Sequence, residues 1–400
     1  MINSYYYKGK TEETEDILDF ANMVFSMSYR SIDFARLIPK AYSKKRCHIP
    51  INHMIKENEK IKALADVYPV TLKQLSKNNT DMDVEIKAAY IGTVCVHPNS
   101  RGKGYMKTLM QKVQEDAISE GFDIMFVDGN RHRYQNYGFE KAGIKYEYCV
   151  RYKNIKHMYN RLYGEYIEPV YSFEPVEDDS PYIDKMYKLY SKKNVMARTK
   201  EEFFLNLKGN RAYTYAVLEG ESFAGYINIS EDESGIHEIE LENVSEIPGI
   251  IYDLFEELAL DEVMITAGVD EIEKTEWLDK ICDFCSMQMS HQIKILNYEK
   301  VLSFLLSWKQ KYCALSDGKY VIGIEAESYN IYSMEIKEGN ISVMETSTEN
   351  PDIILEEMDF VKLFTTGMFF QECNKNDSSV KNAPQGWFPL PFFLPEADAF

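Results

Sequence analysis

The stretch GTVCVHPNSRGKGYMKTLMQKV, residues 92–113, decides the fold. It starts as an apolar run that ends at His97, and it passes through Gly102 and Gly104, which have basic neighbours. Apolar residues then recur every three or four positions. This order predicts a buried strand, a glycine turn and the start of a helix. Backbone N–H groups at such a turn and helix start form a cradle for phosphate.

The neighbouring segments complete an α/β (α+β) unit. Acidic residues lead into helical spacing at 12–29, residues 88–97 read as a buried strand, and residues 123–128 as another. A strand, a helix and a second strand predict a parallel pair joined by a right-handed crossover.

A second unit follows a passage at 153–175 that reads as a linker. Helical patterns at 182–206 and 247–260 flank a predicted hairpin at 213–230, in an order that echoes the first unit. No R-G-x-G follows residue 104, so a repeated fold here would lack the phosphate turn.

A third unit begins with a predicted helix over 298–312. Strand-like alternation follows over 319–346, around a turn at 338–340, and 351–367 reads as a helix. The chain closes on GWFPLPFFLPEADAF, residues 386–400, whose three prolines exclude a regular helix or an internal strand.

The composition restricts the partners. The net charge of −19 argues against a nucleic-acid surface and permits an acidic groove that attracts a cationic substrate. No secretory signal and no apolar run long enough for a membrane span are visible. Seven cysteines fit reduced thiols in a cytoplasmic protein, and we interpret Cys282 and Cys285 as core residues rather than a metal or redox pair.

The phosphate turn excludes two common phosphate binders. G-x-x-x-x-G-K-[ST] is absent, and Gly102-x-Gly104 lacks the third glycine of a dinucleotide fingerprint. The remaining common user is the pyrophosphate of coenzyme A, on a turn of the form R-x-x-G-x-[GA]. Arg101 and Gly104 match this form, whereas Met106 stands where a small residue is usual.

A second motif lies one βα unit downstream, where residues 134–139 read Y-x-x-x-G-F. The pairing of R-G-K-G with this motif resembles the GNAT superfamily of acetyl-CoA-dependent N-acetyltransferases. The resemblance implies that Val94, Cys95 and Val96 line the acetyl-pantetheine arm, and that Tyr134 protonates the departing thiolate. The alternative for Tyr134 is a packed aromatic residue in the corner between strand and turn.

The whole chain resembles the Eis-type (enhanced intracellular survival) acetyltransferases, through VCVHPNSRGKGYMKTLM, DGNRHRYQNYGFEKAG and FPLPFFLPEADAF. This resemblance implies a homo-hexamer with three domains in each chain. The predicted domains are a catalytic GNAT domain at 1–152, a GNAT-like domain without the cofactor turn at 153–288, and a sterol-carrier-like domain with the tail at 289–400.

The same resemblance implies that the terminal carboxylate, on Phe400, enters the first domain and acts as a base. An α-carboxyl group has a pKa of about 3.3 to 3.7, so it needs burial to become a better base. The tail is rich in large aromatic residues, and we expect it to be packed. The alternative is a tail that is buried for stability or at an oligomer interface.

The predicted site contains no metal. Asp33 is predicted to hold the cationic groups of the acceptor, and Glu396 and Asp398 are weaker candidates. His97 and His132 are possible bases by residue type. His97 is expected to be a turn residue instead, and the alternative for His132 is a contact with the cofactor phosphates. The predicted cofactor-binding residues are Val94, Cys95, Val96, Arg101, Gly102, Lys103, Gly104, Tyr105, Met106, Lys107, Gly129 and Asn130.

The predicted function is direct transfer of acetyl from acetyl-CoA to a primary amine of a cationic small molecule or a lysine side chain, in a ternary complex. A backbone N–H of residues 94–96 is expected to stabilise the oxyanion. The alternative is a non-enzymatic ligand- or lipid-binding protein that uses the third domain. The sequence does not identify the acceptor.

Overall fold

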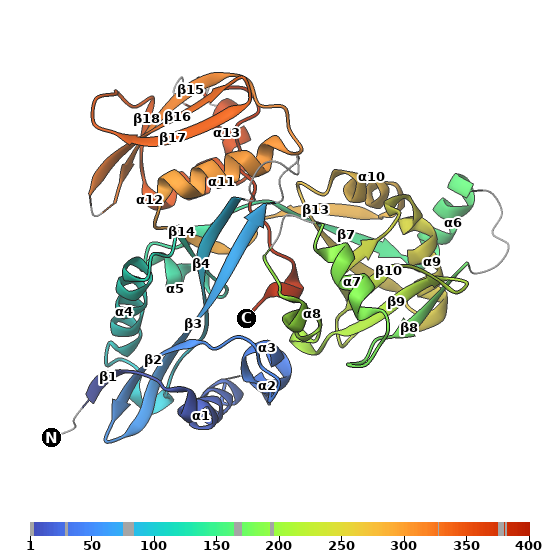
Figure 1. Cartoon of the computed structure of the whole chain (residues 1–400), viewed down its shortest axis with the longest axis horizontal. Coiled ribbons are helices and arrows are strands. Elements are labelled where there is room, and N and C mark those ends of the chain that lie inside the picture. Colours follow the sequence, from blue (N-terminus) through green and yellow to red (C-terminus); the bar gives the residue numbers. More distant parts are fainter. Residues whose placement is uncertain are drawn as a thin grey trace.

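The computed structural model describes residues 4–28, 31–74, 84–163, 170–192, 196–326, 328–374, 380 and 382–400. Three β-sheets, of seven, seven and four strands, organise these residues, and helices cover the sheets (Figure 1). The predicted mixed α/β (α+β) class is confirmed. In the described ranges, no helix is long and apolar enough to cross a membrane.

The first sheet has the order β1-β2-β3-β4-β5-β14-β6. Its strands are β1 (Ser4–Lys8), β2 (Ile51–Glu57), β3 (Lys60–Gln74), β4 (Val84–Val96), β5 (Ile124–Val127), β14 (Gln292–Ile295) and β6 (Glu140–Lys141). Its helices are α1 (Thr14–Ser26), α2 (Phe34–Leu37), α3 (Pro39–Tyr42), α4 (Tyr105–Ser119) and α5 (Arg131–Gln135). The predicted parallel pair is confirmed, because Ala88–Ile91 of β4 pairs with β5 in parallel.

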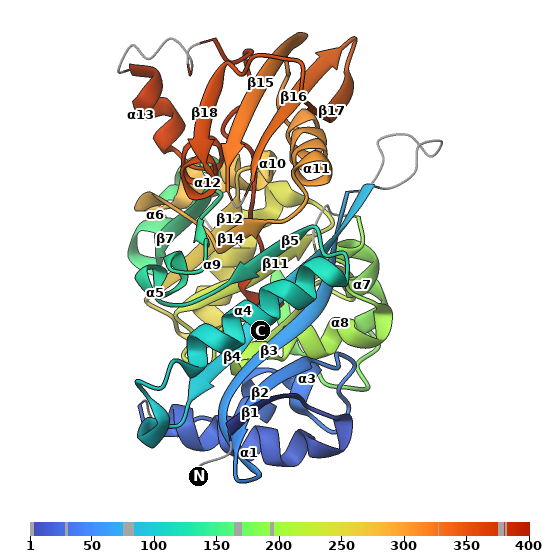
Figure 2. The same ribbon diagram turned by 90° about the vertical axis from the view of Figure 1, so that its left-hand side faces the viewer.

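Alternation along β3 directs its side chains to two separate cores. Leu64 and Tyr68 pack with α1, whereas Ala63 and Ala65 pack with α4 on the opposite face. Figure 2 shows α4 lying across this sheet. The apolar spacing read from the sequence therefore describes α4 correctly, and its buried residues are Leu109, Met110, Val113 and Ala117.

The second sheet repeats the first, strand for strand, in the order β8-β9-β10-β11-β12-β7-β13. Its strands are β8 (Tyr171–Pro175), β9 (Tyr213–Glu219), β10 (Ser222–Ile229), β11 (Gly235–Leu241), β12 (Glu262–Gly268), β7 (Lys145–Arg151) and β13 (Phe284–Gln288). Its helices are α6 (Tyr152–Tyr163), α7 (Ile183–Tyr190), α8 (Lys200–Leu207), α9 (Ile247–Leu258) and α10 (Ile272–Ile281). The pair β11 and β12 is parallel, as β4 and β5 are in the first sheet.

The two sheets exchange their next-to-last strands. β7 follows β6 in the chain but pairs with β12 and β13, whereas β14 follows β13 but pairs with β5 and β6. The sheets therefore do not follow the predicted ranges, since β7 lies within 1–152 and β14 within 289–400. Short strands of this kind carry no sequence signal for the sheet that they join, because partner choice depends on tertiary packing.

The third sheet has the order β17-β16-β15-β18. Its strands are β15 (Gly318–Glu325), β16 (Tyr329–Lys337), β17 (Asn340–Thr346) and β18 (Ile353–Glu356), and its helices are α11 (Tyr298–Gln310), α12 (Glu357–Thr365) and α13 (Met368–Asn374). The prediction of one helix over 351–367 was wrong at its start. Residues 353–356 pair in parallel with β15, and this pairing outweighs their helical spacing.

Three further predictions need correction. The range 182–206 contains two helices, α7 and α8, instead of one; residues 193–195 between them lie outside the described ranges. The predicted linker at 153–175 contains most of α6 and all of β8, and its residues 164–169 are not described. Cys282 is only partly buried and Cys285 is exposed, because α10 ends at Ile281 and an edge strand follows.

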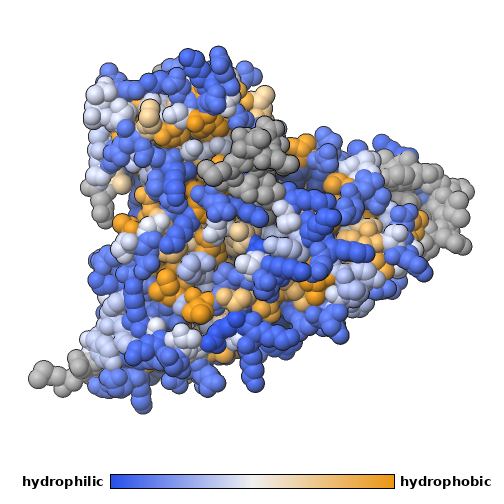
Figure 3. All heavy atoms as spheres, in the orientation of Figure 1, coloured by the Kyte–Doolittle hydropathy of each residue, from blue (hydrophilic) through white to orange (hydrophobic). Residues whose placement is uncertain are grey.

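The C-terminal tail leaves the third unit and ends against the first sheet, in the space between the first and second units (Figure 1). Most of its side chains are buried, including Trp387, Phe392, Leu394, Ala397 and Asp398. Hydrophobic residues gather in the middle of this face of the molecule, and hydrophilic ones surround them (Figure 3). The tail is thus part of the packed structure and links all three units.

Candidate active site

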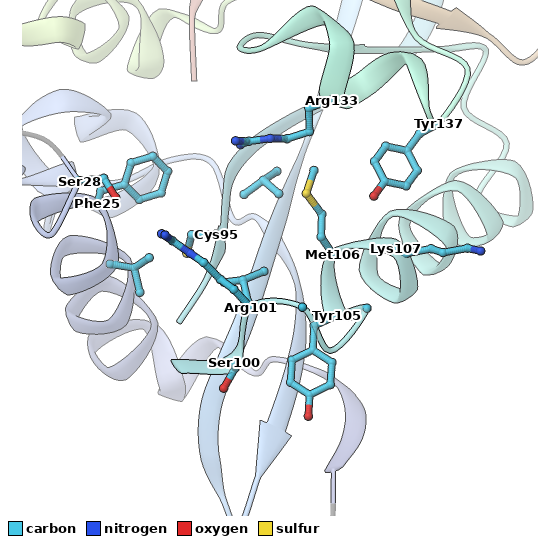
Figure 4. Close-up of a pocket in the computed structure, with 15 residues that line it drawn as sticks. Phe25, Ser28, Cys95, Ser100, Arg101, Tyr105, Met106, Lys107, Arg133 and Tyr137 are labelled. Atoms are coloured by element: carbon cyan, nitrogen blue, oxygen red, sulfur yellow. The ribbon is translucent and has the colours of Figure 1, made fainter. Parts of the chain in front are cut away.

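A cavity of about 650 Å³ lies at the carboxyl end of β4, between α1 and α4 (Figure 4). It is lined by Val24, Phe25, Ser28, Val94, Cys95, Val96, Ser100, Arg101, Gly102, Gly104, Tyr105, Met106, Lys107, Arg133 and Tyr137. Most of the predicted cofactor-binding residues are therefore brought together. Three of them, Lys103, Gly129 and Asn130, are not part of this lining.

β4 carries a β-bulge beside the cavity. Leu64 of β3 faces Cys95 and Asp66 faces Gly92, so a single β3 residue faces both Thr93 and Val94. Thr93 adopts a φ of 51°, which is strained for a β-branched residue. A bulge bends its strand and leaves the extra residue outside the regular ladder, so backbone groups here can serve a ligand.

A buried hydrogen-bond network holds the bulge. The Tyr42 hydroxyl donates to Asp66, and it lies 2.9 Å from the Tyr68 hydroxyl and 3.1 Å from the Thr93 hydroxyl. Tyr68 and Thr93 are also 2.9 Å apart. Burial raises the pKa of Asp66 to about 8, so this carboxyl group is largely protonated at neutral pH. Its Oδ1 has no hydrogen-bond partner among the described residues.

The glycine turn requires glycine for conformational reasons. Gly102 and Gly104 have φ values of 80° and 78°, and a Cβ atom on either would meet nothing within 4 Å. Gly104 is the N-cap of α4, and no side chain in the described part of the chain caps this helix. The turn therefore presents the first N–H groups of α4 at the cavity, where they suit an anion.

The basic residues of the site differ in direction. Arg101 and Arg133 both extend towards α1, whereas the Lys107 and Tyr105 side chains point away from them (Figure 4). Lys103 forms an ion pair of 2.7 Å with Glu57, which also accepts a hydrogen bond from Tyr105. The two arginines are thus the basic side chains best placed to meet a phosphate.

Tyr134 lies on α5, in the core beneath α4, and is 5% exposed. Burial raises its pKa to about 12, so the phenol keeps its proton at neutral pH. No other described residue forms a hydrogen bond with its hydroxyl, which leaves that group available to a ligand. Tyr134 is not among the residues that line the cavity, whereas its neighbours Arg133 and Tyr137 are.

Gly129 and Asn130 shape the turn that positions Tyr134. A Cβ atom at Gly129 would lie 3.2 Å from the Tyr134 ring, and the Asn130 side chain accepts a hydrogen bond from the Arg133 N–H at the start of α5. Both residues therefore support α5 and stay outside the cavity lining.

The chain ends next to the bulge. A Cβ atom at Gly92 would lie 3.2 Å from a carboxylate oxygen of Phe400. The Phe400 ring stacks on Tyr68 at 4.3 Å between centroids, and its edge contact with His48 is 5.2 Å. The terminal carboxylate therefore lies at the strand that leads into the cavity.

Two buried cations hold the end of the tail. The Lys40 ammonium donates to the Asp398 carbonyl at 2.9 Å and lies 3.6 Å above the Phe400 ring. Arg198 pairs with the Asp398 carboxylate at 2.7 Å and also with Glu238. Burial lowers the pKa of Lys40 to about 7. These contacts give Asp398 a structural role, because its side chain is fully buried and paired with Arg198.

The other predicted side chains lie elsewhere. Asp33 caps α2 by accepting the Ala35 N–H, and Glu396 lies 3.5 Å from Lys145. His97 accepts the Asn99 N–H within the turn, as expected. The exposed His132 contacts Gln135 and is not part of the cavity lining.

Sequence reasoning missed several residues of the site. Arg133 lies in the basic R-H-R segment, of which only His132 was predicted to contact the cofactor. Asp66 could have been found from the sequence, because a carboxyl group inside the apolar run ALADVYPV is unusual. Thr93 and Lys40 carried none, because a strained φ and the burial of a lysine depend on residues distant in sequence.

The chain was compared with known proteins. Residues 6–142 match the family described as acetyltransferase (GNAT) domain. Curated protein sequences gave no match. The fold is similar along its whole length to Eis1 from Mycobacterium abscessus, with a TM-score of 0.66 and 11% identity over 100% of both chains.

Two other solved structures are also similar along their whole length. One is the GCN5-related N-acetyltransferase from Anabaena variabilis, with a TM-score of 0.67 and 14% identity over 98% of both chains. The other, from Kribbella flavida, gives a TM-score of 0.66 and 11% identity over 100% of this chain and 99% of its own. Residues 6–142 thus match the GNAT acetyltransferase domain, and the fold of the whole chain is similar to that of Eis1.

Proposed function

We propose that this enzyme transfers the acetyl group of acetyl-CoA directly to a primary amine, on a cationic small molecule or a lysine side chain, within a ternary complex. One observation carries the proposal. A single cavity joins the β4 bulge to the open start of α4, and two arginines extend into it. The bulge suits a thioester arm, and the helix start suits a pyrophosphate.

The proposed cofactor contacts follow from this arrangement. The N–H groups of residues 102–107, together with Arg101 and Arg133, would hold the pyrophosphate. The backbone of residues 94–96 would line the pantetheine arm, as predicted. GNAT acetyltransferases use acetyl-CoA. The lining of this cavity has arginines for the charged part of acetyl-CoA and apolar side chains for its apolar part.

The proposed chemistry has two proton transfers. The amine nitrogen attacks the thioester carbonyl, so that a C–N bond forms and the C–S bond breaks. A backbone N–H at the bulge stabilises the oxyanion. Tyr134 gives its proton to the leaving sulfur. The phenol of Tyr134 is protonated at neutral pH, which supports this role.

The base in this proposal is the Phe400 carboxylate, which takes the proton that the attacking amine nitrogen loses. Its place beside Gly92 and the packing of its ring on Tyr68 support this role, since both fix a chain end that would otherwise fray. The net charge of −19 supports a cationic acceptor. The hexameric state and the cytoplasmic location stay predictions.

Thiol release from acetyl-CoA, measured with a panel of polyamines, aminoglycosides and lysine peptides, tests the proposal. We expect release with at least one amine, and loss of release in Arg101→Glu. Arg161→Glu, an exposed site on α6, makes the same charge change outside the cavity and should leave release unchanged. Coenzyme A binding without release for any amine would overturn the proposed transfer.

A further inference from the structure

The second sheet has a cavity at the place that corresponds to the cofactor cavity. β11 and β12 pair only at Gly235–Ile236 and then separate, just as β4 and β5 pair at Ala88–Ile91 and then separate. A cavity of about 540 Å³ lies where β11 and β12 diverge. It touches α7, β11 and the starts of α9 and α10, which occupy the positions of α1, β4, α4 and α5 in the first unit.

The second cavity has lost the features that suit phosphate. A 3-10 helix at Val244–Glu246 precedes α9, and Asn243 caps it where the first unit has its glycine turn. Pro248 lies in the first turn of α9 and contributes no N–H, and the first residues of this helix are buried. The start of α9 is therefore closed to an anionic cofactor, unlike the start of α4.

The charge of the lining is reversed. The cavity is lined by six carboxylates and three lysines, which are Glu238, Glu240, Glu242, Asp270, Glu271, Glu273, Lys192, Lys274 and Lys311. Lys274 pairs with Glu240 and Glu271, Lys192 lies 3.4 Å from Glu242, and Arg198 behind the wall pairs with Glu238. Six carboxylates stand against three lysines and Arg198, so the wall has an excess of negative charge, which attracts cations and repels coenzyme A.

The remaining walls are aromatic and apolar. Trp308 and Tyr312 of α11 line the cavity, and the Trp308 indole donates to Asp270 at 2.8 Å, which fixes both side chains. Phe393 of the tail forms another wall and packs on Gly268 at the end of β12. Aromatic faces beside carboxylates are the surroundings that organic cations prefer.

We propose that this second cavity binds an amphipathic organic cation, with an ammonium group on an aromatic or aliphatic body. The ammonium group lies at the carboxylates that follow β11 and begin α10, Glu242 and Glu273, and the apolar body lies against α11 and the tail. This site is separate from the acceptor site of the first unit, and the proposal does not depend on the acetyl-transfer chemistry.

Fluorescence titration of the full-length chain with dansylcadaverine, a primary amine with an aromatic body, tests the proposal. Glu242→Lys/Glu273→Lys reverses two exposed lining charges, so the fold should be retained, which circular dichroism checks. We expect this double variant to bind the probe at least about tenfold more weakly than the parent chain.

Glu257→Lys/Glu276→Lys is the matched control. Both residues are exposed on α9 and α10 but lie outside the cavity lining, and the change in net charge is the same. This control should bind as the parent chain does. Equal weakening in both double variants, binding that is unchanged in both, or no binding of the probe to the parent chain would each overturn the proposal.

Discussion

The two seven-stranded sheets share one strand order, yet the connections that follow their central strands differ. The connection from β4 to α4 has a bulge at Thr93, two glycines with positive φ, and a helix start without a side-chain cap. The connection from β11 to α9 has an Asn243 cap, a proline in the first helical turn and a buried helix start. The repeated fold therefore depends on apolar packing, whereas the phosphate cradle depends on a few backbone positions.

The tail connects the two regions. Phe393 lies against the end of β12 where the second sheet opens, and Phe400 lies beside Gly92 where the first sheet opens. At the opening of the first sheet the tail brings the terminal carboxylate of Phe400. The proposed acetyl transfer therefore belongs to the first unit, where residues 6–142 match the GNAT domain.

The largest effect is expected at Tyr134. Tyr134→Phe removes the proposed proton donor and should lower kcat by about 10² to 10⁴-fold, with little change in acetyl-CoA affinity. Tyr215→Phe, a half-buried residue of the second sheet, is the control and should keep full turnover. A kcat that is unchanged in Tyr134→Phe would remove this residue as the acid.

The pH dependence of the rate tests the same role of Tyr134 as proton donor. Since burial raises the pKa of Tyr134 to about 12, the donor is lost only as the pH rises through that value. The rate should therefore not fall on the alkaline side up to about pH 10. A falling limb near pH 8 that disappears in Tyr134→Phe would contradict this pKa.

A smaller loss is expected from extending the chain by one glycine after Phe400. The extension keeps the ring but moves the carboxylate onward by about 3.8 Å, and kcat should fall by about 10²-fold. Phe400→Leu keeps the carboxylate and loses the stacking on Tyr68, so its loss should be smaller. Full activity in the extended chain would contradict the role of the terminal carboxylate.

The two units can be compared directly through glycines with positive φ. Gly104→Ala in the cofactor turn and Gly220→Ala in the β9–β10 hairpin both impose strain of about 1 to 2 kcal/mol without a steric clash. Only Gly104→Ala should weaken acetyl-CoA binding, by about tenfold, in calorimetric titration. Equal effects of the two substitutions on the acetyl-CoA Kd would contradict the claim that only the first unit binds acetyl-CoA.

The smallest effect concerns stability at Asp66. Because burial raises the pKa of Asp66 to about 8, its stabilising protonated form is fully present below about pH 4 and is lost as the pH rises through 8. This loss is at most about 1.4 kcal/mol for each pH unit. Asp66→Asn should flatten the decline of the thermal midpoint between pH 5 and 8. Parallel midpoint curves for the parent and the variant would contradict the pKa of Asp66.

Local pattern predicted a good part of this molecule. The spacing of Leu109, Met110 and Val113 predicted α4, and the glycines before it predicted the turn. The exchange of β7 and β14 was not predictable, because these short strands carry no sign of their partners. Within the candidate site, the glycine turn could be predicted from the sequence. The contact between Asp66 and Tyr42 could not, because it arises only when distant segments pack together.

The stoichiometry of acetyl-CoA binding tests the central claim most directly, since that claim gives the cofactor to only one of two repeated units. Calorimetric titration of the full-length chain should show one acetyl-CoA bound per chain, and Arg101→Glu should abolish this binding. Two molecules bound per chain, or binding that survives Arg101→Glu and is lost when the second cavity is altered, would contradict the account.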